Sequence, residues 1–531
     1  MNVFFLFVYN NFFSTRYVQH KQRLWQRLGI PGPKPIFLLG TDHELGRQSW
    51  PKLTLERYRQ YGKIFGSFQL LTPILTIHEP ELIQQVFIKD FRNYANRMEL
   101  RTYHKYFNEN LFFTDIDKWK RMRAIISPSF TTGKIRSTIP MMNQCIDQLF
   151  EHFERNIQQS NGHLNVRKFI MGLTMDVIAA TGFSTAINSN DSTNVQDSFV
   201  EMGMALFRQN IFQTILAITM PKFLLRLLRI RLFFNEKPYN YFCNLVIRLI
   251  QQRKHDNDQK SADILQLILD AEVDDDVIND DNLDNLIITM NNESNQQSII
   301  NENKEKTKNL RSTLAKGKLT ETEVIANSVL LLIAGFETTS SIIVHCLFEM
   351  AWNPTIQQRC YEELQAKLDG LDYNSHEYFD IIMHKLPYFE SIIKETLRKY
   401  PPCSIIPRSV SVDHCQLNGI PLQKNTIIHL PTHAVHHCED YYPEPEKFLP
   451  ERFMPENRHN LVPYTYFPFG LGPRNCVGMR FAYQELHYCL SRLLLNYHFE
   501  TLPETPSMLT FVKGTPIMQS LPFDLRITKR C

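Results

Sequence analysis

One cysteine near the C-terminal end of the chain, Cys476, lies in a loop suited to presenting a thiolate to a metal. The loop reads Phe-Gly-Leu-Gly-Pro-Arg-Asn-Cys-Val-Gly from Phe469 to Gly478 and continues into an apolar, helix-favouring stretch. A helix N-terminus and the nearby Arg474 both favour the ionised thiol, because each places positive charge beside it. The glycines of the loop can adopt backbone conformations closed to other residues, so the chain can lie flat against a large planar ligand.

A lone cysteine restricts the kinds of metal site that the loop can form. Zinc and iron-sulfur sites need several clustered ligands, whereas haem iron is already held by four porphyrin nitrogens and needs only one more. An ordinary free cysteine at a turn is the alternative. The Gly-x-Gly of the loop suggests a phosphate loop, but Pro473 and Cys476 replace what a dinucleotide fingerprint requires. The run from His433 to Cys438 has its potential ligands too close together to surround an ion unaided.

The cysteine loop resembles the haem-binding signature of the cytochrome P-450 family, Phe-x-x-Gly-x-Arg-x-Cys-x-Gly, and matches every fixed position of it. The resemblance implies haem b, iron protoporphyrin IX, as the cofactor. It makes Cys476 the axial thiolate and the metal ligand, and it places Phe469 and Arg474 among the haem-binding residues.

A second motif lies in a long helix predicted from Thr320 to Asn353. The helix opens on the capping box Thr-Glu-Thr-Glu. It is apolar enough for a membrane span, but four polar interruptions would be costly in lipid, so we expect a buried helix of a globular domain. In its middle, Ala334 to Thr338 combine a small pair, an acid and a hydroxyl. The hydroxyl can bond to a preceding carbonyl and loosen the helix, and the acid can relay protons.

Taken alone, that segment is more typical of a helix-packing site with one satisfied acid. It resembles the oxygen-activating helix of cytochromes P-450. The resemblance makes Glu337 and Thr338 the catalytic acid and alcohol.

Three further segments match the family in the expected order. Glu395 and Arg398 have the Glu-x-x-Arg spacing that places both charges on one helical face. The resemblance adds Arg452, from a Pro-Glu-Arg-Phe segment, and implies a structural ion-paired network behind the haem. An ordinary solvated i, i+3 pair is the alternative.

The third match is the Trp-x-x-x-Arg pattern of Trp119 and Arg123. The resemblance implies that both side chains reach a haem propionate, and arginine suits a carboxylate because its planar fork donates two hydrogen bonds. By position in the family, Arg97, Arg408 and Arg474 complete this clamp.

Composition is compatible with one large enzyme. The chain has 531 residues, 43% hydrophobic and 21% charged, with a net charge of +3 that gives no reason to expect nucleic acid as a partner. The ten cysteines are scattered without a Cys-x-x-Cys pair, which indicates reduced thiols in a cytosol-facing protein. The resemblance runs from about Gly29 to the C-terminus and implies a mainly α fold with small β-sheets, in a single large haem-binding domain.

The chain divides into an apolar membrane-anchor candidate with a basic flank (1–28), a proline-rich hinge (29–35) and the haem-thiolate catalytic domain (36–531). The apolar stretch is shorter than the ~20 residues that a membrane-spanning helix needs, so it either spans a membrane or rests on one. Residues 222–234 alternate arginines with large apolar residues, which indicates either an interfacial helix or a core helix with a solvated basic face. Residues 274–308 are rich in Asp, Asn, Ser and Lys and predict a disordered surface insertion.

The resemblance is closest to the drug- and steroid-oxidising branch of the family and its thromboxane-synthase relatives. It implies a monooxygenase that inserts one atom of dioxygen into a small apolar substrate, such as a steroid, lipid or xenobiotic, at the endoplasmic reticulum membrane with the catalytic domain facing the cytosol. The chain has no Gly-x-Gly-x-x-Gly fingerprint, so electrons are expected from NADPH-cytochrome P-450 reductase, with cytochrome b5 as a second candidate donor. Lys118, Lys120 and Arg121 predict either a docking patch for an acidic reductase or a solvated basic face.

Two other functions fit the same cofactor. Some relatives rearrange peroxides without a reductase, but the intact Glu337-Thr338 pair favours monooxygenation. The second alternative is haem-based sensing or electron transfer. Turnover with a reductase and NADPH would distinguish a monooxygenase from such a non-enzymatic protein. By family position, the substrate-facing residues are expected to be Ala334, Phe336, Ser404, Ile405, Ile406, Thr515 and Ile517.

Overall fold

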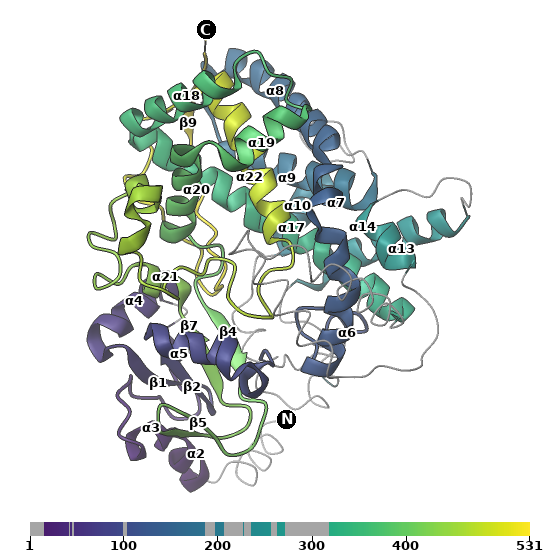
Figure 1. The fold of residues 1–531 in the computed structure, drawn as a ribbon. Helices are drawn as coiled ribbons and strands as arrows, with labels where there is room; N and C mark the ends of the chain where they lie inside the picture. Colours follow the sequence, from purple (N-terminus) through teal and green to yellow (C-terminus); the bar gives the residue numbers. More distant parts are fainter. Residues whose placement is uncertain are drawn as a thin grey trace, which may run out of the picture.

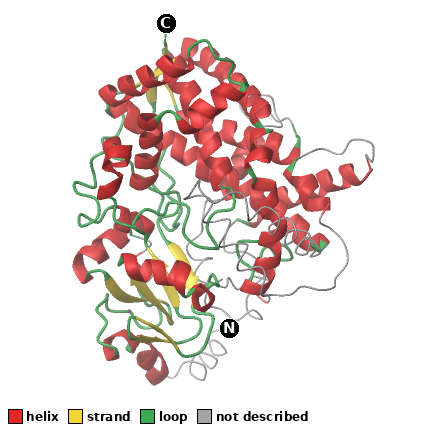
Figure 2. Cartoon of the chain, in the orientation of Figure 1, coloured by secondary structure: helices red, strands yellow, loops and turns green. Residues whose placement is uncertain are grey.

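The computed structural model describes residues 15–41, 43–44, 47–98, 104–185, 197–206, 227, 235–255, 263–270 and 318–530. The predicted apolar anchor before residue 15, the basic segment 222–234 apart from Leu227, and the predicted insertion 274–308 lie outside the described residues. Helices dominate the upper and right-hand part of Figure 1, and most strands gather at the lower left. Figure 2 shows the same division, with helices in red and strands in yellow. The prediction of a mainly α fold with small β-sheets is therefore confirmed.

Helices occur along most of the described chain. The α-helices are α2 (Thr15–Gln22), α3 (Leu24–Arg27), α4 (Trp50–Tyr61), α5 (Pro80–Gln84), α6 (Ile116–Ile126), α7 (Thr132–Arg136), α8 (Ile139–Ser160), α9 (Val166–Phe183), α10 (Asp197–Leu206), α13 (Glu236–His255), α14 (Ile264–Asp270), α17 (Glu321–Trp352), α18 (Pro354–Leu368), α19 (His376–His384), α20 (Pro387–Lys399), α21 (Thr432–His436) and α22 (Met479–Asn496). Five short helices of other types are η2 (Gln85–Lys89), η3 (Phe91–Tyr94), η4 (Ser127–Phe130), η5 (Pro450–Phe453) and η6 (Pro455–Asn460).

Three small sheets accompany the helices. The strands are β1 (Ile64–Gln69), β2 (Thr72–Ile77), β3 (His163–Leu164), β4 (Ile406–Ser409), β5 (Cys415–Leu417), β6 (Ile420–Leu422), β7 (Ile427–Leu430), β8 (Tyr497–Thr501) and β9 (Leu525–Lys529). The largest sheet has the order β1-β2-β7-β4, in which β2 and β7 run parallel and the other pairs antiparallel. The second has the order β3-β9-β8, and β5 pairs with β6 alone. The first sheet therefore brings residues near 75 beside residues near 428, which in turn lie beside residues near 408.

The long predicted helix is α17, which has 32 residues and is about 48 Å long at 1.5 Å per residue. Its capping box is confirmed, because the Thr320 side chain accepts from the Glu323 backbone N–H and the Glu323 side chain accepts from that of Thr320. Within the described residues, it is the one helix long and apolar enough to cross a membrane, but 67% of its most apolar stretch is buried inside the protein. It packs against α9, α13, α20 and α22, so the prediction of a buried core helix is confirmed.

The cysteine loop closes on itself just before α22. The Cys476 backbone N–H donates to the Phe469 carbonyl over 2.9 Å. Two of the three loop glycines, Gly470 and Gly472, have the positive φ expected of them, at 74° and 70°, whereas Gly478 has an ordinary φ of −89°. A Cβ added at Gly472 would lie 1.9 Å from the backbone oxygen of Phe87 in η2. The loop therefore sits against η2 at a distance that only glycine permits.

This close approach predicts the effect of adding one methyl group. Gly472→Ala should destabilise the protein by about 1–3 kcal/mol, because alanine is strained at positive φ and its Cβ overlaps Phe87. Gly133→Ala in α7 is the control, since its Cβ meets no atom within 4 Å. Thermal unfolding followed by circular dichroism should show a lower midpoint for Gly472→Ala alone. Equal midpoints for the two variants would contradict the described packing.

Candidate functional site

The thiol of Cys476 is accessible, yet the groups around it desolvate it. Such a thiol faces an enclosed space rather than bulk solvent. Burial raises the pKa of Cys476, and the Gly478 backbone N–H and the guanidinium groups of Arg123 and Arg97 lower it only in part. The prediction of a lowered pKa was therefore wrong in sign for the free thiol, since desolvation outweighs the positive charges. A bound metal cation reverses this balance, because a coordinating thiol is deprotonated.

Three arginines near Cys476 are desolvated and lack a carboxylate partner among the described residues. Burial lowers the pKa of Arg97 to about 10, and it lowers the pKa values of Arg408 and Arg474 well below their usual range. Arg97 and Arg474 each lower the pKa of Arg408 further by repulsion. Buried atoms without a hydrogen-bond partner include Nε and Nη1 of Arg97, Nε of Arg408, and Nε and Nη1 of Arg474.

Aromatic rings and backbone carbonyls hold these guanidinium groups in place. Arg97 lies 3.6 Å over the Phe112 ring, and Arg408 lies 5.0 Å over that of Phe87. Arg474 lies 4.9 Å over the buried indole of Trp119 and donates to the Thr114 carbonyl over 2.6 Å. Each guanidinium is thus oriented but retains free donors.

Arg123, predicted to reach a haem propionate, bonds to the residue before Cys476 in this structure. Its two terminal nitrogens donate to the backbone oxygen and to Oδ1 of Asn475, each over 2.9 Å. Arg123 therefore fixes the residue before Cys476 rather than presenting a free fork to a carboxylate. Phe469, predicted to bind haem, packs its ring 5.1 Å from that of Tyr483 in α22.

The orphaned donors provide a test of the predicted cofactor. Buried charges are normally paired, because an unpaired ion in a low-dielectric interior costs several kcal/mol or more. Haem b carries two carboxylates on one edge and needs one axial ligand at its centre. An accessible thiol beside Arg97, Arg408 and Arg474 matches that donor set. The residues present therefore fit haem b.

The acid and the alcohol of α17 lie in different surroundings. The Thr338 hydroxyl donates to the Ala334 carbonyl over 2.8 Å, the predicted back-bond within the helix. Ala334 is exposed although most of its helix is buried. Glu337 is 1% exposed and accepts from Arg167 of α9 over 2.7 Å. No hydrogen bond or ion pair among the described residues joins Glu337 or Thr338 directly to the Cys476 loop.

The predicted substrate-facing residues divide into two groups. Ser404, Phe336, Ile405 and Thr515 are buried, and Ser404 donates to the Pro516 carbonyl over 2.8 Å, so it serves the fold. Ala334, Ile406 and Ile517 have accessible side chains. Cys403, which the sequence analysis missed, is partly accessible and electrostatically coupled to both Arg97 and Cys476. No sequence motif marks it.

The predicted network behind the loop is confirmed. Arg398 donates to both carboxylate oxygens of Glu395 over 2.7 and 2.8 Å, and both side chains are fully buried. Nε of Arg452 lies 3.4 Å from Oε1 of Glu395. His436, which sequence analysis considered only in a possible metal cluster, extends the network. Its Nδ1 bonds to the Arg398 carbonyl over 3.0 Å, and its Nε2 accepts from the Phe467 backbone N–H over 3.1 Å.

The three residues of the predicted docking patch are paired or buried in the structure. Arg121 forms a two-fold ion pair with Glu323, Lys118 pairs with Glu109 over 2.9 Å, and Lys120 is buried. These ion pairs reduce the positive charge that the patch presents, although the Lys118 side chain stays exposed.

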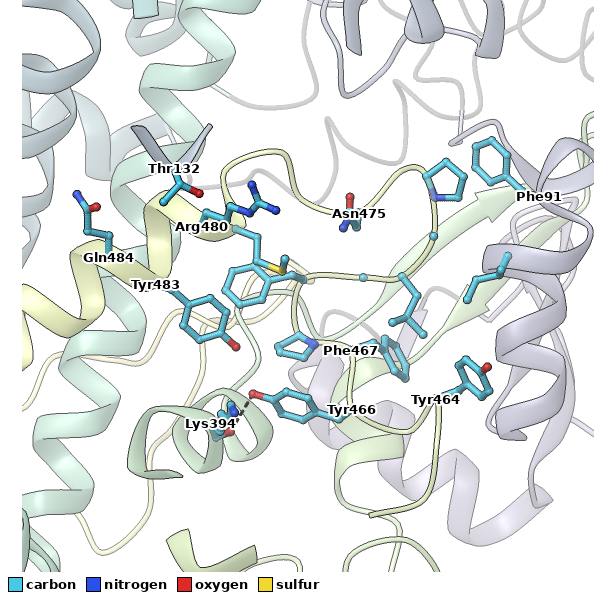
Figure 3. Close-up of a pocket in the computed structure, with 18 of the residues that line it drawn as sticks. Phe91, Thr132, Lys394, Tyr464, Tyr466, Phe467, Asn475, Arg480, Tyr483 and Gln484 are labelled. Carbon is cyan, nitrogen blue, oxygen red and sulfur yellow. Dashed lines mark hydrogen bonds between the residues drawn. The ribbon is translucent and has the colours of Figure 1, made fainter. Parts of the chain in front are cut away.

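A large surface hollow lies elsewhere, against the outer side of the Cys476 loop (Figure 3). Its volume is about 1030 Å³, and residues 467–473 form part of its wall. Figure 3 shows Tyr464 and Phe91 on one side of the hollow and Thr132 and Gln484 on the other, with the Tyr466 hydroxyl donating to the Lys394 carbonyl. The exposed cations Lys89 and Arg480 belong to its lining.

The buried network generates a stability prediction. Arg398→Gln should destabilise the protein by about 3–5 kcal/mol, because it leaves the Glu395 carboxylate buried with a weaker partner. Arg359→Gln is the control, since Arg359 pairs with Glu451 on the surface and should cost only ~0–1 kcal/mol. Urea unfolding of both variants measures the difference. A similar loss of unfolding free energy in the two variants would show that the buried pair has no special structural role.

Comparisons with known proteins identify the family. A model of the family "Cytochrome P450" matches residues 30–526. Cytochrome P450 3A9 of Rattus norvegicus is 31% identical over 522 residues, which cover 97% of this chain and 94% of the relative. Cytochrome P450 3A13 of Mus musculus is 30% identical over 522 residues, and lithocholate 6-beta-hydroxylase of Mesocricetus auratus is 28% identical over 518 residues, with the same coverages. The chain therefore belongs to the cytochrome P450 family and is a haem-thiolate monooxygenase.

Proposed function

We propose that Cys476 is the thiolate ligand of the haem and that the enzyme oxidises an apolar, steroid-sized substrate. The observation that carries this proposal is the accessible Cys476 thiol beside the unpaired, desolvated guanidinium groups of Arg97, Arg408 and Arg474. When bound, haem supplies an iron that activates dioxygen with electrons from a redox partner.

Each arginine would bind a carboxylate edge of the haem with the donors it has free. Arg97 and Arg474 retain two buried donors each, and Arg408 retains one. Trp119 would keep Arg474 at its place by stacking beneath it. Arg123 would act one step further away, by fixing Asn475 and so the backbone that presents Cys476.

Thr338 and Glu337 would handle protons on the oxygen-binding side. The Thr338 hydroxyl can rotate away from the Ala334 carbonyl and donate towards a neighbouring acceptor. Burial raises the pKa of Glu337, an effect that Arg167 opposes, so this carboxyl can hold a proton closer to neutral pH than an exposed one. An acid of this kind is suited to resupplying the hydroxyl with protons.

The substrate class is supported by the accessible side chains and by one relative. Ala334, Ile406 and Ile517 offer apolar surface, and Cys403 adds a small polarisable group. One relative is named for the 6-beta-hydroxylation of lithocholate. We infer that the substrate is a small apolar organic molecule of the steroid, lipid or xenobiotic class.

We assign the redox partner to the hollow on the outer side of the Cys476 loop (Figure 3). A protein docked there would lie against Asn475, the residue directly before Cys476. The exposed Lys89 and Arg480 would favour an acidic surface. NADPH-cytochrome P-450 reductase is the proposed donor, with cytochrome b5 as a second candidate for the same face.

We place the enzyme on the endoplasmic reticulum membrane with its catalytic domain in the cytosol. Ile36, Phe37 and Leu39 expose large apolar side chains in a short turn near the N-terminal end of the described chain. Such residues, next to a predicted apolar anchor, are suited to contact with lipid.

Reconstitution with the reductase and NADPH tests the proposed activity. Wild-type enzyme should convert an apolar steroid, and Thr338→Ala should lower the product formed per NADPH consumed by roughly 10²-fold, the scale of a lost proton-transfer group. Ser340→Ala is the matched control, since Ser340 makes a similar back-bond to the Glu337 carbonyl over 3.1 Å from a buried face of the helix. An unchanged ratio in Thr338→Ala would overturn the role of this hydroxyl, and product formation from peroxides alone would favour rearrangement.

A further inference from the structure

A row of polar side chains runs along one face of α17. Glu337, Ser341, His345 and Glu349 are spaced four residues apart, so they lie one above another over about 18 Å. All four are buried, with exposed fractions of 1%, 2%, 0% and 3%. A polar row inside an otherwise apolar core helix requires partners, because buried polar groups are nearly always hydrogen-bonded.

The middle of the row lacks those partners among the described residues. Neither ring nitrogen of His345 has a hydrogen-bond partner. Oε2 of Glu337 has no partner at hydrogen-bond geometry either, although the Gln519 side chain lies close enough to lower the pKa of this carboxyl. The His345 ring packs 5.1 Å from the Tyr400 ring and 5.8 Å from the Phe511 ring, measured between centroids. Ser341 donates to the other carboxylate oxygen of Glu337 over 3.3 Å, so the row is connected at this end.

The other end of the row reaches the protein surface. The Tyr400 hydroxyl donates to Oε1 of Glu349, and Lys399 donates to the same oxygen over 2.8 Å. The Lys399 side chain is 15% exposed, and Asn353, which donates to Oε2 of Glu349 over 3.3 Å, is partly exposed. Solvent therefore reaches the two side chains that bond Glu349.

We propose that this row is a proton relay, in which His345 links Tyr400 and Glu349 to Glu337. The proposal rests on the proton-handling role given to Glu337 above. One proton enters beside Lys399, passes from Glu349 over the Tyr400 hydroxyl to one ring nitrogen of His345, and leaves from the other nitrogen through Ser341 to Glu337. A neutral imidazole carries one donor and one acceptor, so the proton gained at one nitrogen balances the proton lost at the other. The relay requires a bridging water between the His345 ring nitrogens and their neighbours in the row, where those nitrogens have no partner among the described residues.

Arg167 offers no competing route, although it is nearer to Glu337. A guanidinium group has only donors and stays protonated in proteins, so it holds the carboxylate without passing protons. The charged groups that face His345 and Tyr400 from neighbouring elements are Arg167 in α9, Lys399 and Arg398 in α20, and Glu446. His345 is thus a positioning and relay residue and not one that touches substrate.

Exchange of the Glu337 proton with D2O tests the relay in the resting holoenzyme. The infrared C=O band of protonated Glu337 is assigned by its loss in Glu337→Gln, and its shift after mixing with D2O gives the exchange rate. We expect His345→Phe and Tyr400→Phe, which keep the aromatic packing, to slow this exchange roughly tenfold or more, by the scale of a lost proton-transfer group. His345→Gln, which retains a donor and an acceptor, should restore part of the rate.

The control is His78→Phe, since His78 is also fully buried and packs against Tyr58 and Phe65, at the sheet remote from this row in sequence. Its exchange rate should equal that of wild type. Wild-type exchange in His345→Phe, or no protonated Glu337 band at any pH at which the protein is folded, would overturn the relay. The measurement uses no dioxygen, NADPH or substrate, so loss of the relay and loss of the proposed monooxygenation are separate outcomes.

Discussion

Buried positive charge that no carboxylate pairs with directly, among the residues that the structure describes, is the constraint on which this site depends. Arg97, Arg408 and Arg474 are desolvated beside one another, and their described neighbours are aromatic rings and carbonyls rather than carboxylates. The chain brings them from three distant segments, so their convergence is a product of the fold. Such a cluster is costly until an anion joins it. A dicarboxylate cofactor held at Cys476, as proposed, would supply the charge that the described residues leave unpaired.

Contacts with neighbouring elements hold the cysteine loop, and with it the Cys476 thiol, in a fixed position beside the arginine cluster. The Glu395-Arg398 pair fixes α20 to the segment around residue 449, and His436 carries that connection to the Phe467 backbone just before the cysteine loop. Burial lowers the pKa of His436 to about 3, so its ring stays neutral and can donate at Nδ1 while accepting at Nε2. On the other side, η2 touches the loop at Gly472. The loop is thus held from both sides by contacts that tolerate little change.

Much of this could be predicted because local spacing determines it. The capping box at Thr320 and the Glu395-Arg398 pair depend on residues three apart, and the cysteine loop is defined by consecutive residues. The direction of the Cys476 pKa could not be predicted, because desolvation depends on what packs around the thiol. The pairing of Arg167 with Glu337 likewise depends on how α9 meets α17, which no local pattern encodes. The ion pairs of the predicted docking patch could not be predicted for the same reason, since the partners Glu109 and Glu323 come from other segments.

The carbon monoxide difference spectrum of the dithionite-reduced protein tests the central assignment most directly. The comparison is between wild type, Cys476→Ser and Cys403→Ser, because Cys403 is the other thiol coupled electrostatically to this site. We expect the red-shifted Soret band of thiolate-bound haem in wild type and Cys403→Ser, and its loss in Cys476→Ser with haem content measured in parallel. A band that persists in Cys476→Ser, or one that disappears only in Cys403→Ser, would contradict the assignment of Cys476 as the haem ligand.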